Sequence, residues 1–264
     1  MRTKRRFWAA TQRSCLRSIS VAAVFLAAAA HAALTKETIG NHTCYVYAPA
    51  KLAAHAPLLM LFHGSGRDGM SQIDEWRKLA DAEGIVLVAP NAANTRQWGM
   101  IEDGPDLMRD IAAFATKQYQ IDPRRIYAFG HSAGAVFMLT LAPLESVFLA
   151  AVAVHAGEFR MAKESGLLNF AQRRIPIFIA IGTKDPLFSV DSVRKTRDAF
   201  EGEGFTVEVR EIEGHDHNYY AWSRQINDMV WKFLSPKHLD SDPHFSEYKI
   251  TPSGSSVSIM PVDP

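Results

Sequence analysis

The chain has 264 residues, a length that suits one large α/β domain. It carries 29 Lys and Arg against 28 Asp and Glu, but six of the basic residues and none of the acidic ones lie in residues 1–32. Without that segment 23 basic residues face 28 acidic ones, a net charge of −5. An acidic chain is a poor match for nucleic acid or for an anionic membrane surface, so we expect neither as a partner.

Residues 1–32 have the pattern of a secretory signal peptide. A basic stretch is followed by an alanine-rich apolar run over 19–30 and by Ala30-His31-Ala32, which places small residues where a signal peptidase reads. The apolar run of about 12 residues is shorter than the roughly 20 needed to span a bilayer. We therefore expect cleavage after Ala32, export to the periplasm or the extracellular space, and no stable membrane insertion afterwards.

Removal of residues 1–32 takes Cys15 away and leaves Cys44 as the remaining cysteine. No intramolecular disulfide is then possible, although an oxidising compartment would permit one. Cys44 lies in an alternating, strand-like run over 42–47, and we expect it to pack in the core.

Segments typical of strands and of helices alternate from residue 42 to residue 234. Most of the apolar runs are continuous, as in a parallel sheet that is buried on both faces. Repeated β–α units predict a doubly wound, mostly parallel sheet with helices on both faces and right-handed crossovers. After 42–47, the expected strands cover 57–62, 85–89, 125–129, 149–154, 175–181 and 205–212, and the expected helices cover 72–83, 106–119, 132–141, 189–201 and 219–234.

This pattern predicts a single α/β domain over 33–234, which contains the candidate catalytic residues described below. Residues 235–264 have the Ser, Pro and Gly content of turns and linkers and little periodicity, so we expect a loosely structured C-terminal tail. Residues 155–174, between two expected strands, form too short a segment for a large inserted lid domain, so we expect this end of the sheet to be open.

Residues 130–134 read Gly-His-Ser-Ala-Gly and lie between an expected buried strand and an expected buried helix. This context is the one required of a nucleophile elbow, in which a sharp turn tolerates only very small residues around the serine. The turn would expose Ser132 above the sheet edge, next to a helix N-terminus that favours negative charge. A plain glycine turn is the alternative, and the flanking segments favour the elbow.

A serine hydroxyl becomes a good nucleophile when a histidine accepts its proton and an acid orients that histidine. In α/β-hydrolases the chain order is Ser, acid, His. Asp185 follows an expected strand and is favoured as the acid over Asp191, which lies in the next helix. His215 and His217 are both candidates for the base, and in an extended segment they would point the same way. A metal site at this His-x-His pair would need further ligands, which the nearby sequence lacks, so no metal is expected.

An oxyanion hole needs two backbone N–H groups. We expect one from Ala133, which follows the nucleophile, and the other from Ser65, in the loop after the strand 57–62. His63 in that loop is interpreted as a structural residue rather than a second base. Trp98 lies in a loop after a strand end, where it either lines the substrate site or packs at the surface.

In chain order, these segments resemble α/β-hydrolases of the poly(3-hydroxybutyrate) depolymerase and feruloyl esterase type. The resemblance rests on Leu61–Gly66, Ala89–Asn91, Ile121–Tyr127, Gly130–Gly134 and Gly182–Asp185. It implies an α/β-hydrolase fold and an exported serine esterase without a cofactor. Depolymerases usually carry Gly-His-x-Trp at the base, whereas residues 216–220 are similar to the Asp-His-Ser-Tyr-Tyr of S-formylglutathione hydrolases. That similarity favours His217 as the base and weakens the expectation of a polymeric substrate.

The sequence therefore predicts a serine carboxylic-ester hydrolase that acts on small or polymeric esters through an acyl-enzyme. Ser132 would attack, His217 would carry the proton, and Asp185 would orient the base. One alternative is an exopeptidase or amidase that uses the same three residues. Another is a non-catalytic binding protein on a hydrolase scaffold, although none of the three residues is missing.

Overall fold

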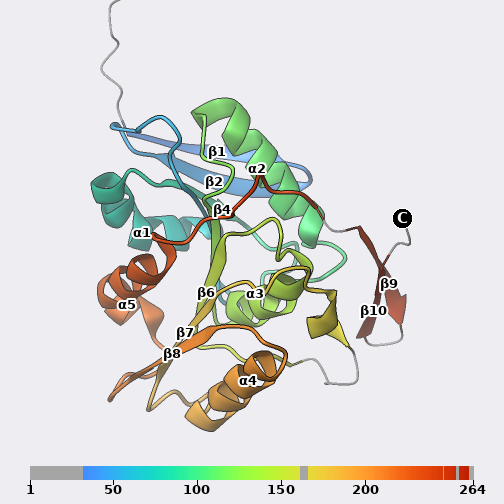
Figure 1. Ribbon diagram of the computed structural model, residues 1–264. Coiled ribbons are helices and arrows are strands. Elements are labelled where there is room, and N and C mark those ends of the chain that lie inside the picture. Colours follow the sequence, from blue (N-terminus) through green and yellow to red (C-terminus); the bar gives the residue numbers. More distant parts are fainter. Residues whose placement is uncertain (1–31, 161–165, 246, 254–255, 262–264) are drawn as a thin grey trace, which may run out of the picture.

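The computed structural model describes residues 32–160, 166–245, 247–253 and 256–261. Apart from Ala32, the predicted signal peptide lies outside these residues. In the described ranges no helix combines the length and the apolar character needed to cross a membrane. Strands form an eight-stranded sheet in the order β1-β2-β4-β3-β5-β6-β7-β8, with helices on both faces (Figure 1). The predicted α/β-hydrolase architecture is thus confirmed.

The six strands from β3 to β8 run parallel, whereas β2 is antiparallel to β4 and β1 is antiparallel to β2. The sequence did not indicate β1, because this edge strand exposes most of its side chains and has little apolar periodicity. The strands are β1 (Ala33–Ile39), β2 (His42–Ala48), β3 (Leu58–Phe62), β4 (Val86–Pro90), β5 (Ile126–His131), β6 (Ala151–His155), β7 (Ile177–Gly182) and β8 (Val207–Ile212).

Two hydrophobic cores lie on opposite faces of the sheet. Helices α1 (Gly69–Glu83) and α5 (Tyr219–Leu234) pack on one face, and α2 (Pro105–Tyr119), α3 (Ala133–Leu144) and α4 (Val190–Gly202) cover the other (Figure 1). Successive side chains of a strand alternate between the two cores, as Met60 and Leu61 do in β3. Burial on both faces explains why the central strands are continuous apolar runs.

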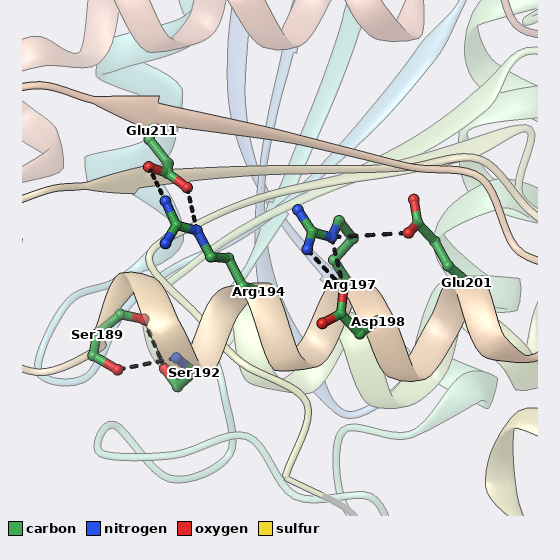
Figure 2. A network of polar contacts seen from close by, with 7 residues as sticks. All are labelled: Ser189, Ser192, Arg194, Arg197, Asp198, Glu201 and Glu211. Atoms are coloured by element: carbon green, nitrogen blue, oxygen red, sulfur yellow. Dashed lines mark hydrogen bonds and ion pairs between the residues drawn. The ribbon is translucent and has the colours of Figure 1, made fainter.

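Helix α4 is tied to the neighbouring strand β8 by surface charges. Arg194 donates two hydrogen bonds of 2.8 Å to the carboxylate of Glu211 (Figure 2). Ser189 caps the helix, because its Oγ accepts the backbone N–H of Ser192 at 3.0 Å. An exposed pair of this kind contributes at most about 1 kcal/mol to the free energy of unfolding.

The C-terminal segment differs from the expected loose tail. Strands β9 (Tyr248–Ser253) and β10 (Ser256–Pro261) pair antiparallel in a separate two-stranded sheet (Figure 1). The Tyr248 hydroxyl donates to the buried carboxylate of Glu145, and the Phe245 ring lies 5.1 Å from that of Phe148. These partners lie about a hundred residues away along the chain, so local composition does not indicate the contact.

Between β6 and β7 the described residues contain only the short 3₁₀ helix η2 (Leu167–Phe170). The carboxyl ends of the parallel strands meet at one edge of the sheet, which is where ligands bind in open α/β folds. The loops that follow β5, β7 and β8 at this edge carry Ser132, Asp185 and His217.

Candidate active site

Ser132 sits at the junction of β5 and α3 in an unusual backbone conformation. Its φ is 55° and its ψ is −114°, a region that residues with a side chain seldom adopt. A Cβ atom on Gly134 would lie 2.2 Å from the Phe62 carbonyl oxygen, and one on Gly130 would lie 2.3 Å from the Gly134 carbonyl oxygen. The sharp turn therefore requires both glycines. Strain of this kind persists where the surrounding structure enforces it, typically at functional sites.

Ser132, His217 and Asp185 form one hydrogen-bonded line. The His217 Nε2 atom lies 2.9 Å from Ser132 Oγ, and its Nδ1 atom lies 2.8 Å from Asp185 Oδ2. A carboxylate only accepts hydrogen bonds, so the ring proton is on Nδ1 and the Nε2 lone pair faces the serine hydroxyl. The other carboxylate oxygen accepts the backbone N–H groups of Leu187 and Phe188 at 2.8 and 2.9 Å. The Asp185 side chain is fully buried, so both its position and its partners are fixed.

The structure separates the two candidate histidines, which the sequence placed on the same side. His215 turns away from Ser132, is 1% exposed, and bonds to His155 through its Nε2 atom at 3.0 Å. Strand β8 ends at Ile212 and Gly214 takes a φ of 72°, so the segment is not extended where the alternation rule would apply. The other candidate acid, Asp191, lies on the surface of α4, where it pairs with Lys195 Nζ at 2.7 Å.

The two expected oxyanion donors border the serine. A Cβ atom on Gly64 would lie 3.2 Å from Ser132 Cβ, so the loop that contains Ser65 lies against Ser132. In the described part of the chain, the backbone N–H groups of Ser65 and Ala133 donate no hydrogen bond. Ala133 is the first residue of α3, where the helix leaves its N–H groups unpaired and favours negative charge.

His63 and Trp98 support this loop. The His63 Nε2 atom accepts the Ala92 N–H at 3.1 Å, so Nδ1 carries the proton and donates to the Gly64 carbonyl at 2.9 Å. Burial lowers the pKa of His63, which favours this neutral form. The Trp98 indole N–H donates to the His63 carbonyl at 2.8 Å, and its ring packs on Phe62 at 5.1 Å. Trp98 is not among the residues that line the pocket beside Ser132.

That pocket has a volume of about 380 Å³ and is bordered by the nucleophile elbow, the loop after β3 and the loops of Asp185 and His217. One side of the pocket is lined by Leu187, an apolar residue that is 65% exposed. On another wall the Arg67 guanidinium lies 4.6 Å from the ring centre of Tyr220. The pocket thus combines an apolar surface with hydrogen-bond donors.

Two histidines in this region were not singled out from the sequence as site residues. His131 lines the pocket, and its Nδ1 atom lies 3.0 Å from Nδ1 of His155. Burial lowers the pKa of His131 to about 3 and that of His155 well below its ordinary value. The available signal was a histidine at the carboxyl end of each of two adjacent buried strands.

Two curated relatives share part of this sequence. A bifunctional acetylxylan esterase/xylanase of Neocallimastix patriciarum is 32% identical over 164 residues, which are 60% of this chain and 23% of that protein. A poly(3-hydroxybutyrate) depolymerase of Ralstonia pickettii is 26% identical over 143 residues, 45% of this chain and 29% of that protein. The chain thus spans about a quarter of the length of these relatives. The predicted resemblance to the depolymerase type is confirmed.

Among solved structures, the fluorophosphonate-binding serine hydrolase F of Staphylococcus aureus aligns with a TM-score of 0.63 at 15% identity. The alignment covers 77% of this chain and 98% of the other, which supports the fold. The model of the dienelactone hydrolase family matches residues 90–232, from the end of β4 to α5, and therefore more than half of the sequence. The chain belongs to the dienelactone hydrolase family.

Proposed function

We propose that this protein is an exported serine hydrolase that cleaves carboxylic esters through an acyl-enzyme. The observation that carries the proposal is the line of Ser132, His217 and Asp185, with hydrogen bonds of 2.9 and 2.8 Å. Geometry and partners match what nucleophilic catalysis by serine requires: a base within reach of the hydroxyl and a buried acid that orients the base.

In the first half of the reaction Ser132 Oγ attacks the ester carbonyl carbon while its proton moves to His217 Nε2. Asp185 stabilises the imidazolium, and the N–H groups of Ser65 and Ala133 bind the oxyanion of the tetrahedral intermediate. When the intermediate collapses, the bond to the alkoxide oxygen breaks. His217 returns the proton to that oxygen and the alcohol leaves.

In the second half a water molecule attacks the acyl-enzyme carbonyl, with His217 Nε2 as the acceptor of its proton. Collapse of this intermediate breaks the bond to Ser132 Oγ, which recovers its proton, and a carboxylic acid is released. Both halves use the same residues, so no further group is needed.

The substrate class follows from the pocket and from the relatives. A volume of about 380 Å³ beside Ser132 suits a short acyl group or one unit of a longer ester. The relatives are named as a bifunctional acetylxylan esterase/xylanase and a poly(3-hydroxybutyrate) depolymerase, names that refer to an acetyl ester and to a polymer of a hydroxyacid. We infer small esters or the exposed units of a polymeric ester as substrates.

The test is a fluorophosphonate probe together with turnover of 4-nitrophenyl esters of graded acyl length. The wild-type protein should be labelled at Ser132 and should hydrolyse the shorter esters. Ser132→Ala should lose labelling and at least about 10⁴-fold in kcat while retaining its melting temperature, because the nucleophile is lost and the packing is not. Ser192→Ala, a change at a half-buried serine of α4 outside the pocket beside Ser132, is the matched control.

Labelling at another residue, or near-normal turnover by Ser132→Ala, would refute the proposal. Aminoacyl amides serve as competing substrates in the same assay. Their faster cleavage would identify an amidase on the same three residues, and a protein that is neither labelled nor active would be a binding protein on a hydrolase scaffold.

A further inference from the structure

Three buried histidines lie in a hydrogen-bonded row behind the candidate nucleophile. We call His131, His155 and His215 the histidine row. Nδ1 of His131 lies 3.0 Å from Nδ1 of His155, and Nε2 of His155 lies 3.0 Å from Nε2 of His215. The three residues are 5%, 0% and 1% exposed. The row crosses from the end of β5 to the end of β6 and then to the loop after β8.

The row leaves one ring proton at one of its two ends. Burial lowers the pKa of all three histidines, so each ring is neutral and carries one N–H at neutral pH. The two hydrogen bonds of the row use two of these protons. Since His155 has a single N–H, both bonds run in the same direction, and the third proton lies either on Nε2 of His131 or on Nδ1 of His215.

The two ends have different surroundings. Nδ1 of His215 is buried and has no hydrogen-bond partner within the described residues. A buried N–H without an acceptor is rarer in proteins than an acceptor that is left under-satisfied. His131, in contrast, lines the pocket, where water or a bound molecule accepts a proton. The third proton therefore belongs on Nε2 of His131.

That nitrogen borders the same space as the nucleophile. A Cβ atom on Gly64 would lie 3.5 Å from Nε2 of His131 and 3.2 Å from Cβ of Ser132. The rings of Tyr219 and His217 lie 5.2 and 5.1 Å from the His131 ring, so neighbouring side chains fix its plane. The N–H therefore has a fixed direction before any substrate binds.

We propose that the histidine row holds His131 as its Nε2–H tautomer and that this N–H donates a hydrogen bond to a substrate oxygen near the scissile ester. The inference rests on the function proposed above and narrows its substrate class. It favours esters with a second acceptor oxygen close to the reacting carbonyl, as in oligomers of hydroxyacids and partial esters of polyols. His131 is then a specificity-determining residue, and His155 and His215 are positioning residues that act through it.

Two substitutions of His131 distinguish the hydrogen bond made by its Nδ1 atom from the one made by its Nε2 atom. In His131→Asn the side-chain amide lies where Nδ1 lies, so the bond to His155 is kept and the donor in the pocket is lost. In His131→Gln the amide reaches the place of Nε2, so the donor is kept and the bond to His155 is lost. The two variants change size and polarity by similar amounts.

The assay compares esters that differ by one oxygen. 4-Nitrophenyl methoxyacetate is paired with the butanoate for the acyl side, and 2-methoxyethyl acetate with butyl acetate for the alcohol side. The ratio of kcat/KM within a pair, compared between variants, cancels intrinsic reactivity. We expect His131→Asn to lower this ratio about fivefold for at least one pair, which corresponds to loss of one hydrogen bond of about 1 kcal/mol. His131→Gln should restore most of the ratio.

A second measurement uses the wild-type protein and needs no turnover. Nitrogen NMR of protein labelled with ¹⁵N-histidine distinguishes protonated from unprotonated ring nitrogens. Nε2 of His131 should be protonated and its Nδ1 unprotonated between pH 8 and pH 5. The opposite tautomer, or a doubly protonated ring, would overturn the inference even if the variants did not fold.

The two proposals fail in different ways. A wild-type protein that hydrolyses both pairs, with the same ratios in His131→Asn, overturns the role of His131 alone. A protein that turns over none of the esters and is not labelled by the fluorophosphonate overturns the esterase function, whatever the tautomer of His131.

Discussion

Acidification should destabilise the folded protein through the histidine row. The pKa of His131 is about 3 in the folded state, against 6.5 for a histidine in water. Between these two pKa values His131 is protonated in the unfolded chain and neutral in the folded chain. The free energy of unfolding therefore decreases as the pH falls. The stability is fully present above pH 6.5 and is lost as the pH falls toward 3. His155 and His215 have lowered pKa values too, and they act in the same direction.

The size of the effect follows from the shift of His131. One pKa unit corresponds to about 1.4 kcal/mol, so His131 alone should remove about 2 kcal/mol of stability between pH 6.5 and pH 5. That is a substantial part of the 5 to 15 kcal/mol typical of a folded domain. With a urea m value of about 2 kcal/mol per molar, the unfolding midpoint should move by about 1 M.

The assay is urea unfolding, followed by tryptophan fluorescence, of wild-type protein and His131→Asn at pH 7, 6 and 5. Carboxylates titrate alike in both proteins, so the difference between their pH slopes isolates the histidine. The wild type should lose about 2 kcal/mol more than the variant between pH 7 and pH 5. His244→Asn changes an exposed histidine and should keep the wild-type slope. Equal slopes for wild type and His131→Asn would refute the burial argument.

Other substitutions test the elbow, the base and the predicted leader. Gly134→Ala should cost about 3 kcal/mol in urea unfolding, because its Cβ would press on the backbone of β3, whereas Gly202→Ala, with open space around it, should change stability little. His217→Ala should depress kcat by about 10⁴-fold or more, and combination with the serine variant should add no further loss. His215→Ala should keep kcat within about one order of magnitude of the wild-type value. If His215→Ala lost activity and His217→Ala kept it, His215 would be the base instead. N-terminal sequencing of exported protein should find Ala33 first, and a start inside the basic stretch would contradict cleavage.

The elements that the sequence predicted are those with local causes. Helix α5 has the expected bounds, Tyr219–Leu234, because its apolar residues recur at helical spacing and face one core. The central strands were recognisable because burial on both faces makes them continuous apolar runs. The elbow was recognisable because Gly130 and Gly134 have no room for a side chain.

The features that the sequence missed depend on distant partners. Strand β9 contacts the domain through the hydrogen bond from Tyr248 to Glu145. Hydrophobic periodicity along the sequence does not predict contacts between residues so far apart. From the sequence, Trp98 could either line the substrate site or pack at the surface. Its hydrogen-bond partner is the His63 carbonyl, which lies in another loop, so the local sequence could not decide between the two. The opposite directions of His215 and His217 follow from the left-handed backbone of Gly214, which a strand-based rule does not include.

The histidine row and the proposed base constrain each other electrostatically. In the proposed mechanism His217 becomes an imidazolium, and its ring centre lies 5.1 Å from that of His131. Two unit charges at about 5 Å repel by about 3 kcal/mol at an effective dielectric constant of about 20, enough to slow the reaction by about two orders of magnitude. If the histidine row were protonated at the pH of the reaction, its charge would therefore oppose the proposed transfer of the Ser132 proton to His217. Burial that keeps His131, His155 and His215 neutral removes this repulsion and leaves a polar but uncharged wall beside the nucleophile.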